Sequence, residues 1–270
     1  MKHDPVKLAL PGHAAATARP ARGLRLALPW PETSGHRAKR AFDIVVSALL
    51  LFGLVGVFAV IAVLIKLDSP GPVFYRVRRV GHRGGPLRML KFRKMRDDAR
   101  GGPLTIDGDP RLTKVGRVLT RTRLDELPQL WDVLCGRMSL IGPRPEDPGF
   151  VALHDIEYRQ ILSVRPGITG LSQIAYKAEA AIVDSDNPVE DYVNRILPQK
   201  LALDGLYAQT NSLGLDLRVL GWTFVTVVLR RPVSVSRLDG TMRLRRRPQP
   251  ALPPAAAAEA ALAAAADAQT

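Results

Sequence analysis

Hydrophobic positions are concentrated in one long run near the N-terminal end of the chain. Residues 44–65 (IVVSALLLFGLVGVFAVIAVLI) include no charged side chain. About 20 apolar helical residues are enough to cross the hydrocarbon core of a bilayer, which is about 30 Å thick. The run is apolar on every helical face, whereas a helix on the surface of a soluble domain keeps a polar face. The pattern therefore predicts a membrane-inserted helix over residues 37–68.

Basic residues lie on both sides of this run. They are Arg37, Lys39 and Arg40 before it, and Lys66, Arg76, Arg78, Arg79 and Arg83 after it. Positive flanks favour the cytoplasmic side of a membrane, so both ends of the helix are expected on that side. A re-entrant helix satisfies this expectation, and it would bend at Gly53 and Gly56, because glycine weakens a helix. A single pass across the membrane remains an alternative.

The segment behind the run changes from apolar to basic. Residues 70–72 (PGP) end the helix, and the alternation in VFYRV predicts a strand. Residues 76–100 carry ten Lys and Arg residues against two Asp residues, which is typical of a face that contacts anionic lipid. Within LKFRKM, the basic residues Lys91, Arg93 and Lys94 alternate with apolar ones, so some of them could point inward at a phosphate.

Two adjacent carboxylates, Asp125 and Glu126, stand in the segment RTRLDELPQLWDVL. The helical spacing of Leu127, Leu130, Trp131 and Leu134 predicts an amphipathic helix with a buried face. Pro128 is tolerated only in the first turn of a helix, which places Asp125 at or near the N-cap. Asp125 could therefore cap the helix while Glu126 complements its dipole, each contributing about 0.5–1 kcal/mol. The alternative is a reactive pair.

Donors suited to phosphate surround the pair in the sequence. They are Arg117, Arg121 and Arg123 before it, Arg144 between Pro143 and Pro145 in MSLIGPRPED, and Arg165 in RPGITGLSQI. The two prolines fix the direction of Arg144, and arginine binds phosphate through two parallel hydrogen bonds. Among such donors, the two acids could bind a metal ion that bridges to a diphosphate, or one of them could attack phosphorus.

Composition and charge set the remaining expectations. The formal charge of +14 over 270 residues predicts an anionic partner. Residues 1–36 predict a disordered arm, and residues 233–270, basic and then rich in Ala and Pro, predict a disordered tail. Residues 69–232 are expected to form one α/β domain, mostly helical with a few short strands. Its last helix, over 214–231, would lie on the membrane or pack on the first helix.

The order of motifs along the chain resembles that of one protein family. The motifs are KRAFDI, the apolar run, SPGPVFYR, KFRKM, DPRLTKVGRVL, LDELPQLWDVL, MSLIGPRPE, RPGITGLSQI and LDLRVL, within residues 39–231. They resemble the bacterial sugar transferases that act as monotopic polyprenyl-phosphate sugar-1-phosphate transferases. The resemblance implies a membrane-dipping helix and a catalytic domain on the cytoplasmic face of the bacterial inner membrane.

The resemblance also implies a reaction, namely transfer of a sugar-1-phosphate from a UDP-sugar to undecaprenyl phosphate with release of UMP, as a membrane step of surface polysaccharide or glycoconjugate synthesis. Asp125 matches the nucleophile of the family, which forms an aspartyl–phosphosugar intermediate. Glu126 matches its partner, and together the two acids would hold Mg²⁺. Arg144, between Pro143 and Pro145, would bind the nucleotide. The further substrate-binding candidates are Lys91, Arg93, Arg111, Arg121, Arg165 and Asp204, where Asp204 matches an acid near the family's site and Arg111 looks paired with Asp109.

Two other classes of function are open to this sequence. A membrane-tethered protein that binds nucleic acid or anionic lipid through its charge would explain the basic composition but not the acid pair. Under the family resemblance the partners are a UDP-sugar, undecaprenyl phosphate and membrane lipid, and no nucleic acid is expected. A cysteine hydrolase using Cys135 and His154 is the less favoured class, because Cys135 continues a helical apolar face and is expected in the core. The transferred sugar, the pathway and the oligomeric state are not predicted.

Overall fold

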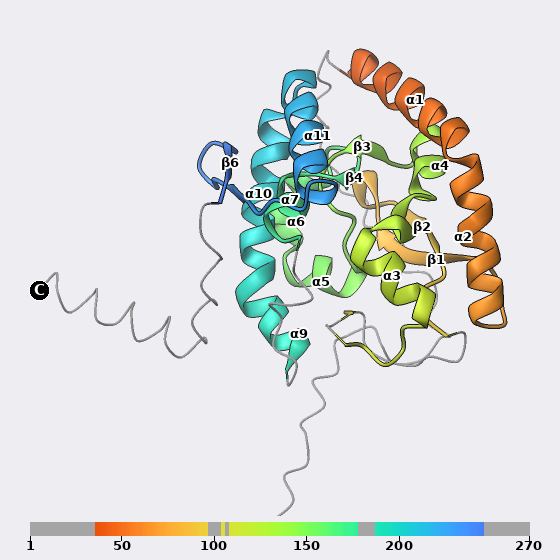
Figure 1. Ribbon diagram of the computed structural model, residues 1–270. Helices are drawn as coiled ribbons and strands as arrows, with labels where there is room; N and C mark the ends of the chain where they lie inside the picture. Colours follow the sequence, from red (N-terminus) through yellow and green to blue (C-terminus); the bar gives the residue numbers. More distant parts are fainter. Residues whose placement is uncertain (1–35, 97–103, 106–107, 178–186, 246–270) are drawn as a thin grey trace, which may run out of the picture.

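The computed structural model describes residues 36–96, 104–105, 108–177 and 187–245. Residues 1–35 of the predicted N-terminal arm and the Ala- and Pro-rich end of the tail lie outside these residues, whereas His36, the last residue of that arm, begins the first helix. The described part is mostly helical and includes three two-stranded sheets, so the predicted α/β fold class is confirmed (Figure 1).

The long apolar run forms two helices rather than one. Helix α1 (His36–Gly53) and helix α2 (Val55–Asp68) meet at Leu54, where their axes bend by 60°. The predicted bend is confirmed at Gly53, whereas Gly56 lies inside the first turn of α2. No single helix of the described residues is long and apolar enough to cross a bilayer, although the two helices together have that length and composition.

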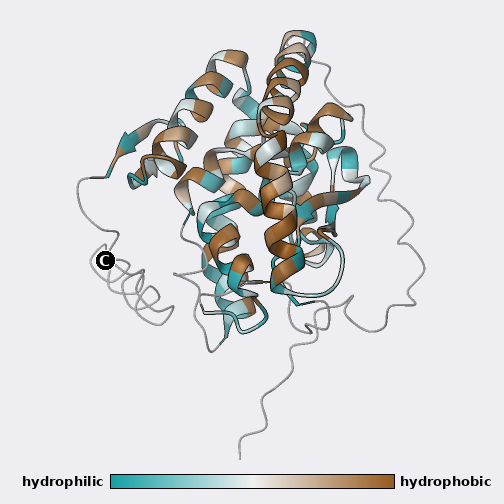
Figure 2. Ribbon diagram, turned by 45° about the vertical axis from the view of Figure 1, so that its right-hand side comes forward, coloured by the Kyte–Doolittle hydropathy of each residue, from teal (hydrophilic) through white to brown (hydrophobic). Residues whose placement is uncertain are grey.

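The bent pair lies along one side of the molecule and consists largely of hydrophobic residues (Figures 1 and 2), many of them exposed. Phe52, next to the bend, is 84% exposed, and Leu49 and Val55 on either side of it are also exposed. Only Ile61 and Ile65 of α2 are buried. A helix on the surface of a soluble domain would instead turn its apolar side chains toward the core.

Polar side chains in the first half of α1 attach it to the domain. Lys39 Nζ lies 2.7 Å from Asp216 Oδ2 and donates to the Ile141 carbonyl. Arg40 donates to the carbonyls of Val133 and Leu134 at 2.6 and 2.8 Å. The carboxylate of Asp43 accepts bonds from Ser139 Oγ and Leu140 N. The other end of the pair is attached as well, because Asp68 Oδ2 accepts a bond from Val115 N at 2.9 Å.

The basic segment behind the pair forms an antiparallel hairpin. Strand β1 (Phe74–Val80), which includes most of the predicted VFYRV strand, pairs with β2 (Pro86–Phe92) across a short 3-10 turn, η1 (His82–Gly84). Leu87, Met89 and Lys91 alternate on the buried face of β2. The hairpin therefore directs Lys91 into the domain, while Arg76, Arg78 and Arg88 stay exposed.

Helix α3 (Lys114–Thr122), the 3-10 turn η2 (Leu124–Glu126) and helix α4 (Gln129–Leu134) follow. The predicted capping role is wrong: α4 starts after Pro128, and no side chain caps it, because the acid pair has its own turn before the proline. The predicted buried face is also wrong at two positions. Trp131 is 51% exposed, and Cys135 is exposed because it follows the last residue of α4.

The centre of the domain is a parallel pair of strands, β3 (Ser139–Ile141) and β4 (Gly167–Thr169). The loops at their ends pass so closely that Gly142, Gly167 and Gly170 have no room for a side chain; a Cβ on Gly167 would lie 2.1 Å from Gly142 N. The nearby helices are α5 (Pro148–Leu153), α6 (Asp155–Ile161) and α7 (Leu171–Ala175).

The C-terminal part closes the domain. It comprises α9 (Pro188–Asp191), the π-helical turn η3 (Tyr192–Ile196), α10 (Leu197–Thr210), α11 (Leu213–Val227), β5 (Val233–Val235) and β6 (Met242–Leu244). Strands β5 and β6 form a hairpin inside the segment predicted as a disordered tail, and that prediction is wrong for residues 233–244. Val233 is buried in the main core, and Gly240, with a φ of +69°, permits the turn.

Candidate active site

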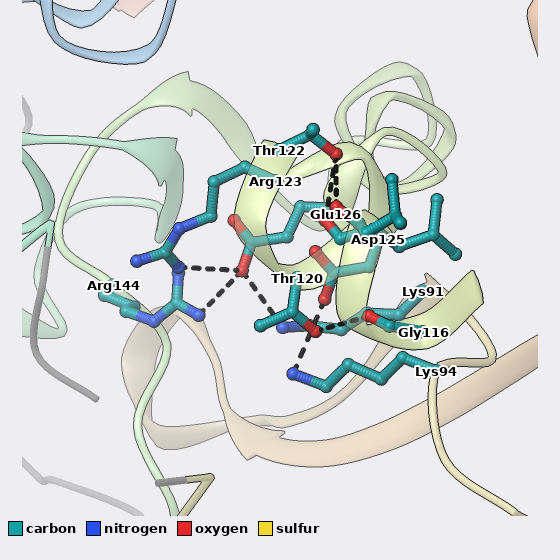
Figure 3. A network of polar contacts seen from close by, with 11 residues as sticks. Lys91, Lys94, Gly116, Thr120, Thr122, Arg123, Asp125, Glu126 and Arg144 are labelled. Atoms are coloured by element: carbon teal, nitrogen blue, oxygen red, sulfur yellow. Dashed lines mark hydrogen bonds and ion pairs between the residues drawn. The ribbon is translucent and has the colours of Figure 1, made fainter. Parts of the chain in front are cut away.

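The acid pair lies in η2, where α3 meets α4. Asp125 and Glu126 are 3% and 7% exposed, although both are charged residue types. Leu124 and Leu127, on either side of the pair, pack against a buried cluster that includes Ile61 and Ile65 of α2. The pair is therefore held against the membrane-inserted helix that the sequence predicted, and its carboxylates turn toward β2 and the loop of Arg144 (Figure 3).

One oxygen of Glu126 is shared by three cations. Glu126 Oε1 accepts hydrogen bonds from Lys91 Nζ at 3.1 Å and from Arg144 Nη2 at 2.8 Å, and Arg123 Nη1 lies 3.8 Å away (Figure 3). Burial acts to raise the pKa of this carboxyl, but the charges of Arg144, Lys91 and Arg123 outweigh it and hold the pKa well below its usual value. Glu126 is therefore an anion at any physiological pH.

Lys91 illustrates how strongly the site depends on charge balance. Its burial lowers the pKa of the ammonium, and the charges of Arg144 and Lys94 lower it further, whereas Glu126 and Asp125 raise it. Four cations, Lys91, Lys94, Arg123 and Arg144, surround these two carboxylates. The arrangement is suited to an additional anion such as a phosphate.

Asp125 has a different environment from its neighbour. Its Oδ2 lies 3.6 Å from Lys94 Nζ, beyond hydrogen-bond distance. Within the described part of the chain, no donor makes a hydrogen bond to this carboxylate. Asp125 is thus a buried carboxylate with its lone pairs uncommitted, whereas Glu126 is fixed by its neighbours. Of the two acids, only Asp125 has a carboxylate that is free to act as a nucleophile.

The backbone positions the pair through two unusual features. Arg123 has a left-handed conformation with a φ of +61°, which costs a non-glycine residue about 1–2 kcal/mol. This turn separates α3 from η2 and lets the Arg123 side chain reach both Glu126 and the carbonyl of Lys177, at 2.8 Å. Strain of this kind persists where the surrounding contacts determine the conformation.

Close packing of α3 fixes the backbone of Lys94. A Cβ on Gly116 would lie 1.8 Å from the Lys94 carbonyl oxygen, so only glycine fits there. The same carbonyl accepts a hydrogen bond from Thr113 N at 3.1 Å. The main chain of Lys94 is therefore held against α3, and the side chain extends from it toward Asp125 (Figure 3).

Arg144 is held by the loop that the sequence predicted to be rigid. The Pro143 carbonyl accepts a bond from Gly167 N at 2.8 Å, and the Glu146 carbonyl accepts one from Val80 N at 3.0 Å. The Glu146 carboxylate accepts a bond from Tyr192 Oη at 2.7 Å. Pro143 and Pro145 are both buried. They thus shape the loop, while Arg144 makes the contact with the acid pair.

Asp204, on α10, is the predicted acid farthest along the chain. It is buried, and burial raises its pKa to about 7; a hydrogen bond with Ser172 and the charges of Lys200 and Arg144 oppose the rise, and Glu146 adds to it. Its Oδ1 atom has no hydrogen-bond partner among the described residues. Asp204 therefore lies within the electrostatic reach of Arg144 but makes no contact with Asp125 or Glu126.

Four predicted binding residues lie elsewhere. Arg93 donates to the carbonyls of Ser69 and Pro70 and so completes the end of α2. Arg111 forms an ion pair with Asp109 at 2.6 Å, which agrees with the predicted pairing. Arg165 donates to the Gly136 carbonyl beyond α4, and Arg121 is exposed on α3. None of these side chains contacts the acid pair.

Lys94 and Arg123 were named among the basic residues near the acid pair, but they were not among the predicted substrate-binding residues, and the structure places both beside the pair. The spacing of Arg123 and Glu126, three residues apart, was a usable signal for an ion pair within one turn. For Lys94, the sequence did not tell which of the three basic residues of LKFRKM points inward. Lys94 follows the end of β2, where strand alternation no longer tells which way a side chain points.

The acid pair fits a magnesium ion that arrives with a phosphate ligand. Magnesium typically uses one or two carboxylates together with substrate phosphates. The carboxylate of Asp125 and the Oε2 atom of Glu126 accept no hydrogen bond within the described ranges, so they are available as ligands. No cluster of three or more His, Cys, Asp or Glu side chains suited to a metal occurs in the described part.

Comparison with known proteins agrees with this geometry. The model of the family described as "Bacterial sugar transferase" matches residues 34–230. The exopolysaccharide production protein PSS of Rhizobium leguminosarum is 38% identical over 201 residues, 71% of this chain and 96% of that protein. A UDP-glucose:undecaprenyl-phosphate glucose-1-phosphate transferase of Caulobacter vibrioides is 36% identical over 225 residues, 82% of this chain and 78% of that protein.

A protein of the same name from Escherichia coli is 45% identical over 145 residues, which cover 50% of this chain and 30% of that longer protein. The segment matched by the family model, residues 34–230, includes the bent helix pair and every residue of the acid-pair site. The chain belongs to the bacterial sugar transferase family.

Proposed function

We propose that the protein transfers a sugar-1-phosphate from a UDP-sugar to undecaprenyl phosphate through an aspartyl–phosphosugar intermediate on Asp125. The observation that carries the proposal is the contrast between the two acids. Glu126 is fixed by Lys91 and Arg144, whereas the carboxylate of Asp125 is buried and accepts no hydrogen bond from the described residues. The names of the relatives supply the two substrates.

The reaction divides into two steps at one carboxylate. In the first, an oxygen of Asp125 forms a bond to the phosphorus that carries the sugar. The bond from that phosphorus to the bridging oxygen breaks, and UMP leaves with the electron pair. In the second, a phosphate oxygen of the lipid attacks the same phosphorus, and Asp125 leaves as a carboxylate. Each step then requires only one substrate at the site.

The cations make attack by an anion on an anion possible. A diphosphate and a carboxylate repel each other unless positive charge lies between them. Arg144 and Arg123 present planar guanidinium groups next to the pair, and such groups bind phosphate oxygens in bidentate fashion. Glu126 orders these cations, and a bound magnesium ion would add charge neutralisation at the diphosphate.

The bent helix pair supports a re-entrant arrangement at the cytoplasmic face of the inner membrane. Both ends of the pair are attached to one domain, through Lys39 and Arg40 at the start of α1 and through Asp68 at the end of α2. A spanning segment would separate its two ends by the full bilayer thickness. With both ends attached to the domain, the exposed apolar bend at Phe52 would enter one leaflet and return.

The same arrangement would bring the site to its lipid substrate. Leu124 and Leu127, which flank the acid pair, pack against the cluster that includes Ile61 and Ile65 of α2, so the pair lies near this helix. A polyprenyl phosphate keeps its chain in the bilayer and its phosphate at the surface. Attachment of the site to a helix at that surface allows Asp125 to meet a water-soluble nucleotide sugar and a lipid phosphate at one place.

The test is UMP release by the full-length protein in lipid nanodiscs. Wild type and Asp125→Asn are incubated with magnesium, undecaprenyl phosphate and a panel of UDP-sugars. The proposal predicts UMP with at least one donor for wild type and a loss of at least about 1,000-fold for Asp125→Asn, as for removal of other enzymatic nucleophiles. Asp155→Asn, at the start of α6 where the carboxylate is about half exposed, serves as the matched control and should keep wild-type activity.

An Asp125→Asn variant as active as wild type would contradict the nucleophile assignment. A protein that binds anions through charge alone would show no UMP release, and Asp125→Asn would bind UDP no worse than wild type. The panel of donors also identifies the sugar, which neither the motifs nor the site geometry specifies.

A further inference from the structure

We propose that Lys94 is an exchangeable counter-ion: it pairs with Asp125 in the free enzyme and transfers to the phosphoryl group as the substrate binds and reacts. The inference rests on the proposed function, which it deepens by adding a residue that touches the reacting atoms. It starts from the ion pair between Lys94 Nζ and Asp125 Oδ2, which are 3.6 Å apart (Figure 3).

The two lysines of the site are held very differently. Lys91 is buried in the sheet, its side chain is 11% exposed, and it makes a hydrogen bond of 3.1 Å to Glu126. The side chain of Lys94 is 21% exposed, and its contact with Asp125 is too long for a hydrogen bond. Lys91 is therefore a fixed charge, whereas Lys94 can leave its partner without breaking a hydrogen bond.

Because the backbone of Lys94 is fixed, the proposed exchange requires movement of its side chain alone. Its carbonyl is held by Thr113 N and by the close approach of Gly116. A lysine side chain has four rotatable carbons beyond this fixed point, and its ammonium has no preferred direction for its three donors. The ammonium can thus turn from Asp125 to a phosphate oxygen next to it while the main chain keeps its place.

The charge balance of the proposed reaction requires such an exchange. In the first step the Asp125 carboxylate becomes a neutral acyl group bonded to phosphorus. The negative charge that it loses appears on the leaving UMP. An ammonium that stayed beside the new ester oxygen would lose its counter-ion. The non-bridging oxygens of the transferred phosphoryl group keep one negative charge, and they lie within a bond or two of Asp125. Lys94 would follow the charge from the carboxylate to the phosphoryl group.

Kinetics of the first step test whether Lys94 acts there. UMP formation without lipid acceptor is measured in a rapid-mixing experiment for wild type, Lys94→Gln and Lys94→Arg. Loss of a charge that stabilises a transition state typically costs about 10–1,000-fold in rate. We expect Lys94→Gln to slow the first step at least 10-fold, with a change of less than about threefold in the KM for the donor. Lys94→Arg, which keeps the charge, should recover most of the rate.

The matched control is Arg96→Gln. Arg96 lies two residues farther along the same segment, is exposed, and has no ion pair with an acid of the described residues. The Arg96→Gln substitution removes one positive charge from the same segment but from an exposed side chain. It should therefore leave the rate of the first step within about twofold of wild type. Equal rates for Lys94→Gln and Arg96→Gln would overturn the proposal, as would a Lys94→Arg variant that folds and is as slow as Lys94→Gln.

Binding of UDP with magnesium tests the exchange itself without turnover. In wild type, Lys94 has to leave Asp125 before it can contact a phosphate, whereas in Asp125→Asn it is already released. Lys94→Gln should therefore weaken UDP binding at least about threefold more in the Asp125→Asn background than in wild type. The same loss in both backgrounds would overturn the exchange and leave the proposed function intact. A wild-type protein that binds no UDP would contradict the proposed function and this inference together.

Discussion

The adjacent carboxylates Asp125 and Glu126 should respond in opposite ways when each loses its charge. Glu126→Gln keeps the shape of the side chain but leaves Lys91, Arg144 and Arg123 without their shared counter-ion. Asp125→Asn removes a charge whose one ion pair among the described residues, with Lys94, is 3.6 Å long. The substitution at Glu126 should therefore destabilise the fold, whereas the substitution at Asp125 should affect activity alone.

The contacts of Glu126 set the size of the effect. Both Glu126 and Lys91 are about one-tenth exposed, and removal of one partner of such a buried pair costs about 3–5 kcal/mol. An amide oxygen can still accept the hydrogen bond from Arg144, so we expect about 3 kcal/mol, the lower end of that range. For a domain of this size, that corresponds to a fall in Tm of about 6–12 °C. Asp125→Asn should change stability by less than about 1 kcal/mol, because loss of the 3.6 Å ion pair with Lys94 is offset by relief from burying a charged carboxylate.

Thermal unfolding of the protein in nanodiscs, followed by tryptophan fluorescence, measures both values. Glu157→Gln is the matched control, because Glu157 is exposed and its contact with His154 is 3.8 Å long. The double variant Lys91→Met with Glu126→Gln should lose less stability than the sum of the two single variants, since neither charge then remains unpaired. A Tm of Glu126→Gln within about 2 °C of wild type, or additive losses, would refute the reasoning.

Three further outcomes follow from the same contacts. The pKa of Glu126 is depressed in the folded protein, so the stabilisation that this carboxylate contributes is fully present above the unfolded pKa of about 4.3 and is lost as pH falls toward the lower folded pKa. The loss of stability with falling pH should therefore be less steep for Glu126→Gln than for wild type in acid unfolding followed by circular dichroism. Gly116→Ala would place a Cβ 1.8 Å from the Lys94 carbonyl and should lower stability by at least about 1–3 kcal/mol in thermal unfolding, whereas Gly221→Ala, with open space around it, should not. Asp216→Asn breaks its buried ion pair with α1, at a cost of about 3 kcal/mol, and should speed tryptic cleavage at residues 37–40; unchanged cleavage would contradict the anchoring of α1.

Much of the membrane segment was predictable from the sequence. The length of the uncharged run and the glycine at position 53 predicted a helix with a bend there, and the structure has two helices that meet at Leu54. The attachment of α1 could not be predicted in the same way. Lys39 and Asp216 are far apart in the chain, and the charge of Lys39 was read as a membrane flank rather than as half of a buried ion pair.

The candidate site was predicted in part. The acid pair and the loop of Arg144 were found because adjacent acids and a Pro-Arg-Pro turn are local signals. Arg93 was misplaced because it shares a basic segment with Lys91, yet it points the other way and bonds to the end of α2. Apolar periodicity also failed at Trp131, because a helix of one and a half turns buries only part of its predicted face.

The most direct test of the account is whether a phosphosugar becomes attached to Asp125. The protein in nanodiscs is incubated with magnesium and its UDP-sugar donor, without lipid acceptor, then digested at low temperature and examined by mass spectrometry. We predict that the peptide containing residues 124–137 gains the mass of one sugar phosphate, that the fragment ions place it on Asp125, and that undecaprenyl phosphate removes it. An unmodified peptide in a preparation that releases UMP only when the acceptor is present would contradict the covalent intermediate and with it the role assigned to Asp125.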